Sequence, residues 1–261
     1  MPSVTGAAAL ACDLTMLVKL VIMMLALTLD GRVQAGEIIG GHEAVPHSRP
    51  YMVLIRRNIQ GKPSKYCGGF LLSKGFVLTA AHCQASSYTV FLGLHNFNHR
   101  NETQNVSVEQ AFPHEDFQTK NYANDIMILK LSSKAKLGKH VKPINFSNQS
   151  EELIPKSCSV SGWGYTVRNI KKLSPVLMEV DVTLVVNEWC PQVNTFCSEG
   201  LPAPGPGDSG GALVCEGGEA YGVVTASFTP YPGGLEMYTF TKISPYRRWI
   251  NSIIKVDDKR W

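Results

Sequence analysis

The feature that most constrains the fold is a succession of short apolar runs, rich in β-branched and aromatic residues and separated by Gly, Pro, Asn or Ser. They cover residues 52–55, 70–72, 76–79, 88–92 and 126–131, and then 159–162, 177–186, 212–215, 221–225 and 237–242. Such runs are typical of strands joined by tight turns. About a dozen strands are too many for one small sandwich. We therefore predict an all-β chain of two antiparallel barrels, roughly over residues 50–142 and 143–261.

The C-terminal segment departs from this strand pattern. Its apolar residues recur at helical spacing and share one face. They are Tyr246, Trp249, Ile250, Ile253 and Ile254. We predict a terminal α-helix docked on the second barrel, with a helix lying on a membrane surface as the weaker alternative.

The N-terminal 35 residues are typical of a secretory signal peptide. Lys19 precedes a ten-residue apolar run, 20–29, and Ala35 ends a segment suited to cleavage. Met16 would begin a more ordinary signal peptide than Met1. A membrane anchor is the alternative, but crossing the bilayer requires about 20 apolar residues. We therefore predict a signal peptide over 1–35, secretion of the chain and no membrane span.

The charge of the secreted part limits the class of partner. Residues 1–37 hold two of the 25 basic and three of the 21 acidic residues, which leaves 23 against 18, a net charge of +5. This value is ordinary for a soluble protein and also suits sulfated proteoglycan, which we retain as a candidate partner. The sequence has no run of five Lys or Arg residues, so we expect no nucleic-acid partner.

Cysteines and sequons both indicate an extracellular chain. Of seven cysteines, Cys12 lies in the leader, and the other six predict three disulfides with 15 connectivities open. None is spaced with histidines as a zinc site requires, and we predict no metal. Four asparagines in two polar, loop-like clusters begin N-glycosylation motifs, and we expect at least one to carry a glycan. They are Asn101, Asn105, Asn145 and Asn148.

Three motifs occur in an order that indicates acyl-transfer chemistry. His82 lies in the segment Thr-Ala-Ala-His-Cys, Asp125 in Asn-Asp-Ile, and Ser209 in Gly-Asp-Ser-Gly-Gly. A hydroxyl is a poor nucleophile at neutral pH, so Ser209 needs His82 as base, and Asp125 would fix the tautomer of that base. The N–H groups of Gly207 and Ser209 could stabilise the oxyanion, where losing one donor typically costs ~3 kcal/mol.

Together with Ile-Ile-Gly-Gly at 38–41 and Ser-Gly-Trp-Gly at 161–164, these motifs resemble the chymotrypsin family of serine proteases. The resemblance covers residues 38–261. It implies two six-stranded barrels with the active site between them, and peptide-bond hydrolysis through an acyl-enzyme without metal or cofactor. It also implies three disulfides: Cys67–Cys83, Cys158–Cys215 and Cys190–Cys197.

The same resemblance predicts a zymogen. The amino group of Ile38, once released, would pair with the Asp208 carboxylate and order the oxyanion hole. The preceding Gly36-Glu37 is similar to the activation dipeptide of granzymes, mast-cell chymases and cathepsin G, which a dipeptidyl peptidase removes before granule storage. Serpin-type inhibitors are further candidate partners, and a secreted, duodenase-like digestive enzyme is an alternative with the same chemistry.

Substrate preference is less clearly encoded. Ala203 stands where trypsin-like members carry Asp, and Glu236 aligns with the back wall of the pocket, as in cathepsin G. We therefore predict cleavage after Phe, Tyr or Leu, with Lys as an additional residue. Thr225-Ala226-Ser227 replaces the family's usual Ser, aromatic and Gly.

Three further departures affect the cleft: Pro206 precedes Gly207, and the segments 190–197 and 197–209 are both short. They leave a competing hypothesis of a catalytically weak protease-fold protein that binds microbes or glycosaminoglycans.

Overall fold

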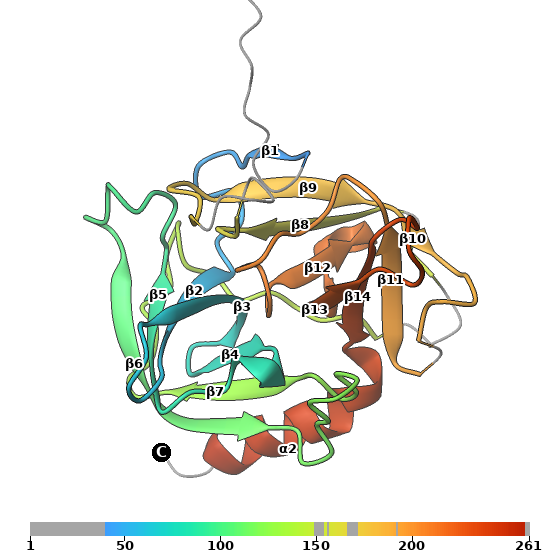
Figure 1. Cartoon of the computed structure of the whole chain (residues 1–261). Coiled ribbons are helices and arrows are strands. Elements are labelled where there is room, and N and C mark those ends of the chain that lie inside the picture. The colour runs from blue at the N-terminus through green and yellow to red at the C-terminus, as the bar shows by residue number, and fades with distance from the viewer. Residues whose placement is uncertain (1–39, 149–153, 156, 166–171, 192, 259–261) are drawn as a thin grey trace, which may run out of the picture. The chain divides into compact units, whose positions relative to one another are not determined.

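The computed structural model describes residues 40–148, 154–155, 157–165, 172–191 and 193–258, without the side chains of 256–258 (Figure 1). The chain separates into two units, 1–35 and 36–261. The predicted signal peptide, Gly36-Glu37 and Ile38 lie outside the described residues. Among the residues that are described, no helix is long and apolar enough to cross a membrane.

The first half of the described chain forms a closed six-stranded barrel, as predicted. Its antiparallel strands follow the order β2-β3-β4-β7-β6-β5, and β2 also pairs with β5. Their apolar side chains fill the interior, so that all four residues of the β4 strand are buried. The strands are β2 (Met52–Asn58), β3 (Lys65–Ser73), β4 (Phe76–Thr79), β5 (Ser87–Leu92), β6 (Gln104–Pro113) and β7 (Met127–Leu131).

The second half, joined by β1 from the N-terminal end, forms an eight-stranded antiparallel sheet in the order β1-β9-β8-β12-β13-β14-β11-β10. Only Thr183 separates β9 from β10, although β10 lies at the far edge of this order. The sheet therefore curls so that the segment 178–185 pairs with β8 through β9 and with β11 through β10. Counted this way, the sheet has six chain segments, with β1 added at its edge. The strands are β1 (His42–Glu43), β8 (Cys158–Gly162), β9 (Met178–Val182), β10 (Leu184–Val185), β11 (Thr195–Glu199), β12 (Ala212–Cys215), β13 (Ala220–Phe228) and β14 (Met237–Lys242).

The predicted terminal helix is α2 (Arg247–Asp258), but its predicted position was wrong. The ring of His114, which directly follows β6, lies 5.1 Å from the rings of both Tyr246 and Trp249. Ile250 is completely buried in the core that contains the first-barrel residues. Figure 1 likewise shows α2 alongside β6 and β7. The helix therefore packs on the first barrel, with Trp249 against His114.

The three disulfides have the implied pairings, Cys67–Cys83, Cys158–Cys215 and Cys190–Cys197. The first closes a 16-residue separation between β3 and the 3-10 turn η1 (Ala81–Cys83), which contributes ~3 kcal/mol on a chain-entropy estimate. The other 3-10 turns are η2 (Glu216–Gly218) and η3 (Ser244–Tyr246).

The four sequon asparagines are all exposed. Asn105 differs from the expectation of a loop, because it lies in β6.

Candidate active site

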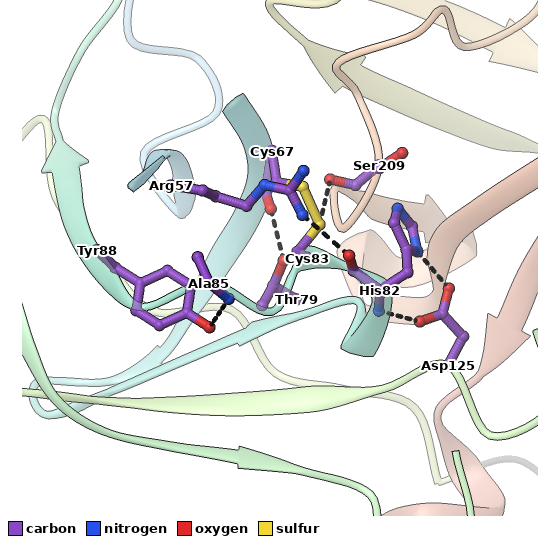
Figure 2. Close-up of a disulfide and its surroundings, with 10 residues drawn as sticks. Arg57, Cys67, Thr79, His82, Cys83, Ala85, Tyr88, Asp125 and Ser209 are labelled. Carbon is purple, nitrogen blue, oxygen red and sulfur yellow. Dashed lines mark hydrogen bonds and ion pairs between the residues drawn. A yellow bond between two sulfur atoms is a disulfide. The ribbon is translucent and has the colours of Figure 1, made fainter. Parts of the chain in front are cut away.

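The position of His82 follows from the end of strand β4. The chain leaves this buried strand and enters η1, which the Cys67–Cys83 disulfide ties back to β3. The Arg57 guanidinium donates a 2.9 Å hydrogen bond from Nη1 to the carbonyl of His82 (Figure 2). The backbone that carries the imidazole is thus held on both sides.

Asp125 is fully buried and binds His82 through both carboxylate oxygens. Its Oδ2 lies 2.7 Å from Nδ1 of the imidazole, and its Oδ1 accepts a 2.8 Å hydrogen bond from the backbone N–H of His82. The preceding Asn124 has a φ of +56° and accepts a 2.8 Å hydrogen bond from the Tyr246 hydroxyl. This arrangement keeps the proton on Nδ1 and leaves Nε2 free to accept one.

Ser209 approaches His82 from the second sheet. Its carbonyl accepts a 2.8 Å hydrogen bond from the N–H of Gly68, whose own carbonyl accepts one from the Thr79 hydroxyl. Gly210 has a φ of +87°, and a Cβ there would lie 2.1 Å from Thr79 Oγ1, so only glycine fits. Figure 2 shows the imidazole of His82 between Asp125 and Ser209.

The oxyanion loop is also held by backbone contacts. Gly207 has a φ of +105°, and a Cβ at this position would lie 2.9 Å from the Leu173 side chain. The Pro206 carbonyl accepts a 2.7 Å hydrogen bond from the N–H of Tyr165. Because the Pro206–Gly207 peptide is trans, the Gly207 N–H points away from Tyr165. Gly207, Ser209 and His82 line one cavity of about 450 Å³.

Asp208 is a buried carboxylate with unusual electrostatics. Its oxygens accept hydrogen bonds from the N–H groups of Gly164, at 2.7 Å, and Gly205, at 2.9 Å. Burial raises the pKa of Asp208 to about 6, and these two hydrogen bonds only partly offset that rise. A Cβ at Gly162 would fall 2.0 Å from the carboxylate, so the Ser-Gly-Trp-Gly motif makes room for Asp208.

A second cavity, of about 520 Å³, adjoins Ser209 and His82 on the other side. Glu236 stands in its wall, and its carboxylate accepts hydrogen bonds from Ser227 Oγ, at 2.7 Å, and the Tyr238 hydroxyl, at 2.9 Å. Ser227 therefore orients Glu236. The lining residues are His82, Tyr122, Pro204, Gly205, Pro206, Ser209, Val224, Thr225, Ala226, Ser227, Glu236 and Tyr238.

Ala203 and Ala226 occupy different surroundings. Ala203 is completely buried in the core of the second sheet, whereas its neighbours Pro204 and Gly205 line the 520 Å³ cavity. Ala226 borders both this cavity and a third one of about 480 Å³, which extends between the 120–123 segment and β11, β13 and β14. A small side chain at 226 leaves this third space open.

Two contributors to the site were absent from the sequence prediction. The Tyr122 ring packs edge-on against His82, with centroids 5.5 Å apart, and Tyr238 binds Glu236. Neither residue belongs to a recognisable motif. The available signals were the closeness of Tyr122 to Asp125 in the chain and that of Tyr238 to Glu236.

Comparison with known proteins agrees with this geometry. The family model described as Trypsin matches residues 38–250. Granzyme B(G,H) of Mus musculus is 41% identical over 251 residues, covering 91% of this chain and 99% of the relative. Chymase of Papio hamadryas is 40% identical over 246 residues, covering 90% and 97%. The solved structure of GrC aligns with a TM-score of 0.75 at 35% identity, covering 84% of this chain and 100% of the other.

Proposed function

Because this chain belongs to the trypsin family of serine proteases and is a serine endopeptidase, we propose that it cleaves protein or peptide substrates after Phe, Tyr or Leu, and also after Lys. The 520 Å³ cavity beside Ser209 supports this preference through its size and its partly apolar lining. Glu236 offers a carboxylate in the cavity wall for a substrate ammonium. Ala203 offers no charge for Arg.

The proposed reaction depends on one observation, the 2.7 Å contact between His82 Nδ1 and Asp125 Oδ2 beside Ser209. Ser209 Oγ attacks the substrate carbonyl while Nε2 of His82 takes its proton. The imidazolium then gives that proton to the leaving amine, and water hydrolyses the acyl-enzyme by the same route. Asp125 stabilises the imidazolium, and the N–H groups of Gly207 and Ser209 bind the oxyanion.

Activation follows from the buried Asp208 carboxylate. Two backbone donors leave this carboxylate with a raised pKa. The α-amino group of Ile38, released by a dipeptidyl peptidase that removes Gly36-Glu37, would supply the missing positive charge. A buried charge without a partner typically costs about 3–5 kcal/mol, which is enough to keep the uncut oxyanion loop inactive.

We place the enzyme outside the cell or in secretory granules, in keeping with its predicted signal peptide and the names of its relatives. Serpin-type inhibitors and sulfated proteoglycan complete its proposed partners. The net charge of +5 after residue 37 supports the proteoglycan interaction.

The test is hydrolysis of a peptide library varied at the residue before the cut. We would compare protein beginning at Ile38, protein retaining Gly36-Glu37, and a Ser209→Ala control. Only the Ile38 form should cleave, after Phe, Tyr, Leu and Lys. In that form Glu236→Gln should lower kcat/KM for Lys substrates by at least about tenfold and leave Phe substrates unchanged. Glu199→Gln, an exposed position at the end of β11, is the matched control.

The competing function is a binding protein on the same scaffold, favoured by the open space beside Ala226. If none of the three proteins cleaves any peptide, although each has a native circular dichroism spectrum, the protease function is rejected and binding to glycosaminoglycan is favoured. That binding would then be measured on immobilised heparin.

A further inference from the structure

A cluster of possible metal ligands lies outside the catalytic site. His47 comes from the segment between β1 and β2, Glu102 from the turn before β6, and His140 from the segment between β7 and β8. Each offers one ligand atom, and these atoms all lie within 4.8 Å of one another. Three segments far apart in the sequence therefore bring two imidazoles and a carboxylate together.

The contacts within the cluster are close. The rings of His47 and His140 stack with centroids 3.7 Å apart and an interplanar angle of 13°. The Nδ1 atom of His140 lies 2.5 Å from Oε2 of Glu102. A neutral imidazole has one ring nitrogen with a lone pair that can bind a metal ion.

A tight turn holds His47 at the cluster. Ser48 donates a hydrogen bond to the carbonyl of Val45, which closes a four-residue turn with Pro46 and His47 at its centre. His47 has a φ of +61°. A positive φ is usual for glycine and, among other residues, for Asn, Asp and His, so histidine suits this turn.

A third imidazole borders the cluster on its inner side. The ring of His95 lies 5.9 Å from that of His47, and its Nε2 is 2.9 Å from a carboxylate oxygen of Glu43. Its Nδ1 atom is buried and has no hydrogen-bond partner among the residues that the structure describes. The outer side is accessible, since the Glu102 side chain is 67% exposed and that of His140 is 23% exposed.

We propose that His47, Glu102 and His140 form a binding site for Zn²⁺, remote from the catalytic serine. Two imidazoles and one carboxylate are a common donor set for zinc, with water in the fourth position. Ca²⁺ and Mg²⁺ prefer oxygen ligands alone, so the two ring nitrogens discriminate against them.

Binding would connect the β5–β6 connection and the segment between β7 and β8 to the segment that precedes β2. Since the ligands come together only in the folded chain, zinc should stabilise the native state by mass action. This role is structural and needs no change in the catalytic residues, so it holds whether or not the proposed cleavage preference is correct.

The experiment is a calorimetric titration of the Ser209→Ala protein, beginning at Ile38, with ZnCl₂, together with thermal unfolding. We expect one Zn²⁺ per chain and a melting temperature higher by about 5 °C at a zinc concentration a hundredfold above Kd. Glu102→Gln, His47→Ala and His140→Ala should each weaken binding by at least about tenfold and remove the rise in melting temperature. Titration with CaCl₂ should give no binding heat comparable with that of ZnCl₂.

His99→Ala is the matched control, because His99 is an exposed histidine of the β5–β6 connection outside the cluster. Glu102→Gln keeps the test decisive even if a histidine variant unfolds, since this side chain is largely exposed. The proposal fails if the wild-type site binds no zinc. It also fails if Glu102→Gln and His140→Ala bind zinc as tightly as His99→Ala does.

Discussion

The two walls of the catalytic cleft are built differently. The base wall, which carries His82 and Asp125, is part of a closed barrel and is held by a disulfide and by hydrogen bonds between these two residues. The substrate wall comprises residues 203–209, 225–227 and Glu236, and it consists largely of loops beside open cavities. The general base is held in the barrel, whereas the wall that carries Ser209 also contains the positions that differ from the family pattern.

This difference reflects what each wall must do. A proton-transfer pair loses most of its effect when displaced by about 1 Å, so its support must be rigid. A specificity pocket tolerates changes such as Ala226 and Ser227, because these alter which substrate binds without moving the base. Chemistry and selectivity should therefore respond separately to mutation.

The largest expected effect is on the base wall. Asp125→Asn should lower kcat by about ten-thousand-fold, because the amide favours the wrong tautomer of His82. Exposed Asp116→Asn, nine residues earlier on the same connection, is the control and should stay within about twofold of wild type. Steady-state kinetics of the Ile38 form on a Phe substrate measure both. If the kcat of Asp125→Asn stayed within tenfold of the wild-type value, the base wall would not have the catalytic role assigned to it here.

A second prediction concerns Asp208, at the inner end of the substrate wall. Its folded-state pKa of about 6 exceeds the ordinary 3.8, so the folded protein holds this proton more tightly than the unfolded chain. The uncut protein should therefore lose stability as pH rises from about 4 through about 6, by ~3 kcal/mol in total.

Urea unfolding at pH 4 and pH 7.5 checks this, with uncut Asp208→Asn as the comparison. The difference in unfolding free energy between the two proteins should change by that amount between the two pH values. An unchanged difference would mean that Asp208 is not the destabilising charge. In the Ile38 form, the proposed ion pair should abolish the effect.

The smallest effect is expected at Ala226. Ala226→Trp should occupy part of the 480 Å³ cavity and lower kcat/KM by about tenfold for peptides with a large apolar residue upstream of the cleavage position. Peptides with Ala at that upstream position should be cleaved as before. Ala226→Ser is the size-matched control. If kcat/KM fell equally for both sets of peptides, the substitution would have disturbed the substrate wall as a whole, and the proposed difference between the two walls would not hold.

Much of the fold was predictable, since β2, β4 and β14 each combine apolar residues with β-branched or aromatic ones. Strands β6 and β11 were not predicted. β6 is mostly polar on its exposed face, and β11 is short and holds a cysteine. Their strand character comes from pairing with β5, β7 and β14, which local composition does not reveal.

The sequence by itself determined the all-β class, the terminal helix and the three motifs of the active site, because turn residues, side-chain periodicity and short motifs are properties of neighbouring residues. Only the tertiary structure decided that α2 packs on the first barrel against His114, that Ser227 and Tyr238 orient Glu236, and that His47 stacks on His140. These contacts join residues distant in the chain. Their burial and spacing depend on how the barrels close, which no local pattern encodes.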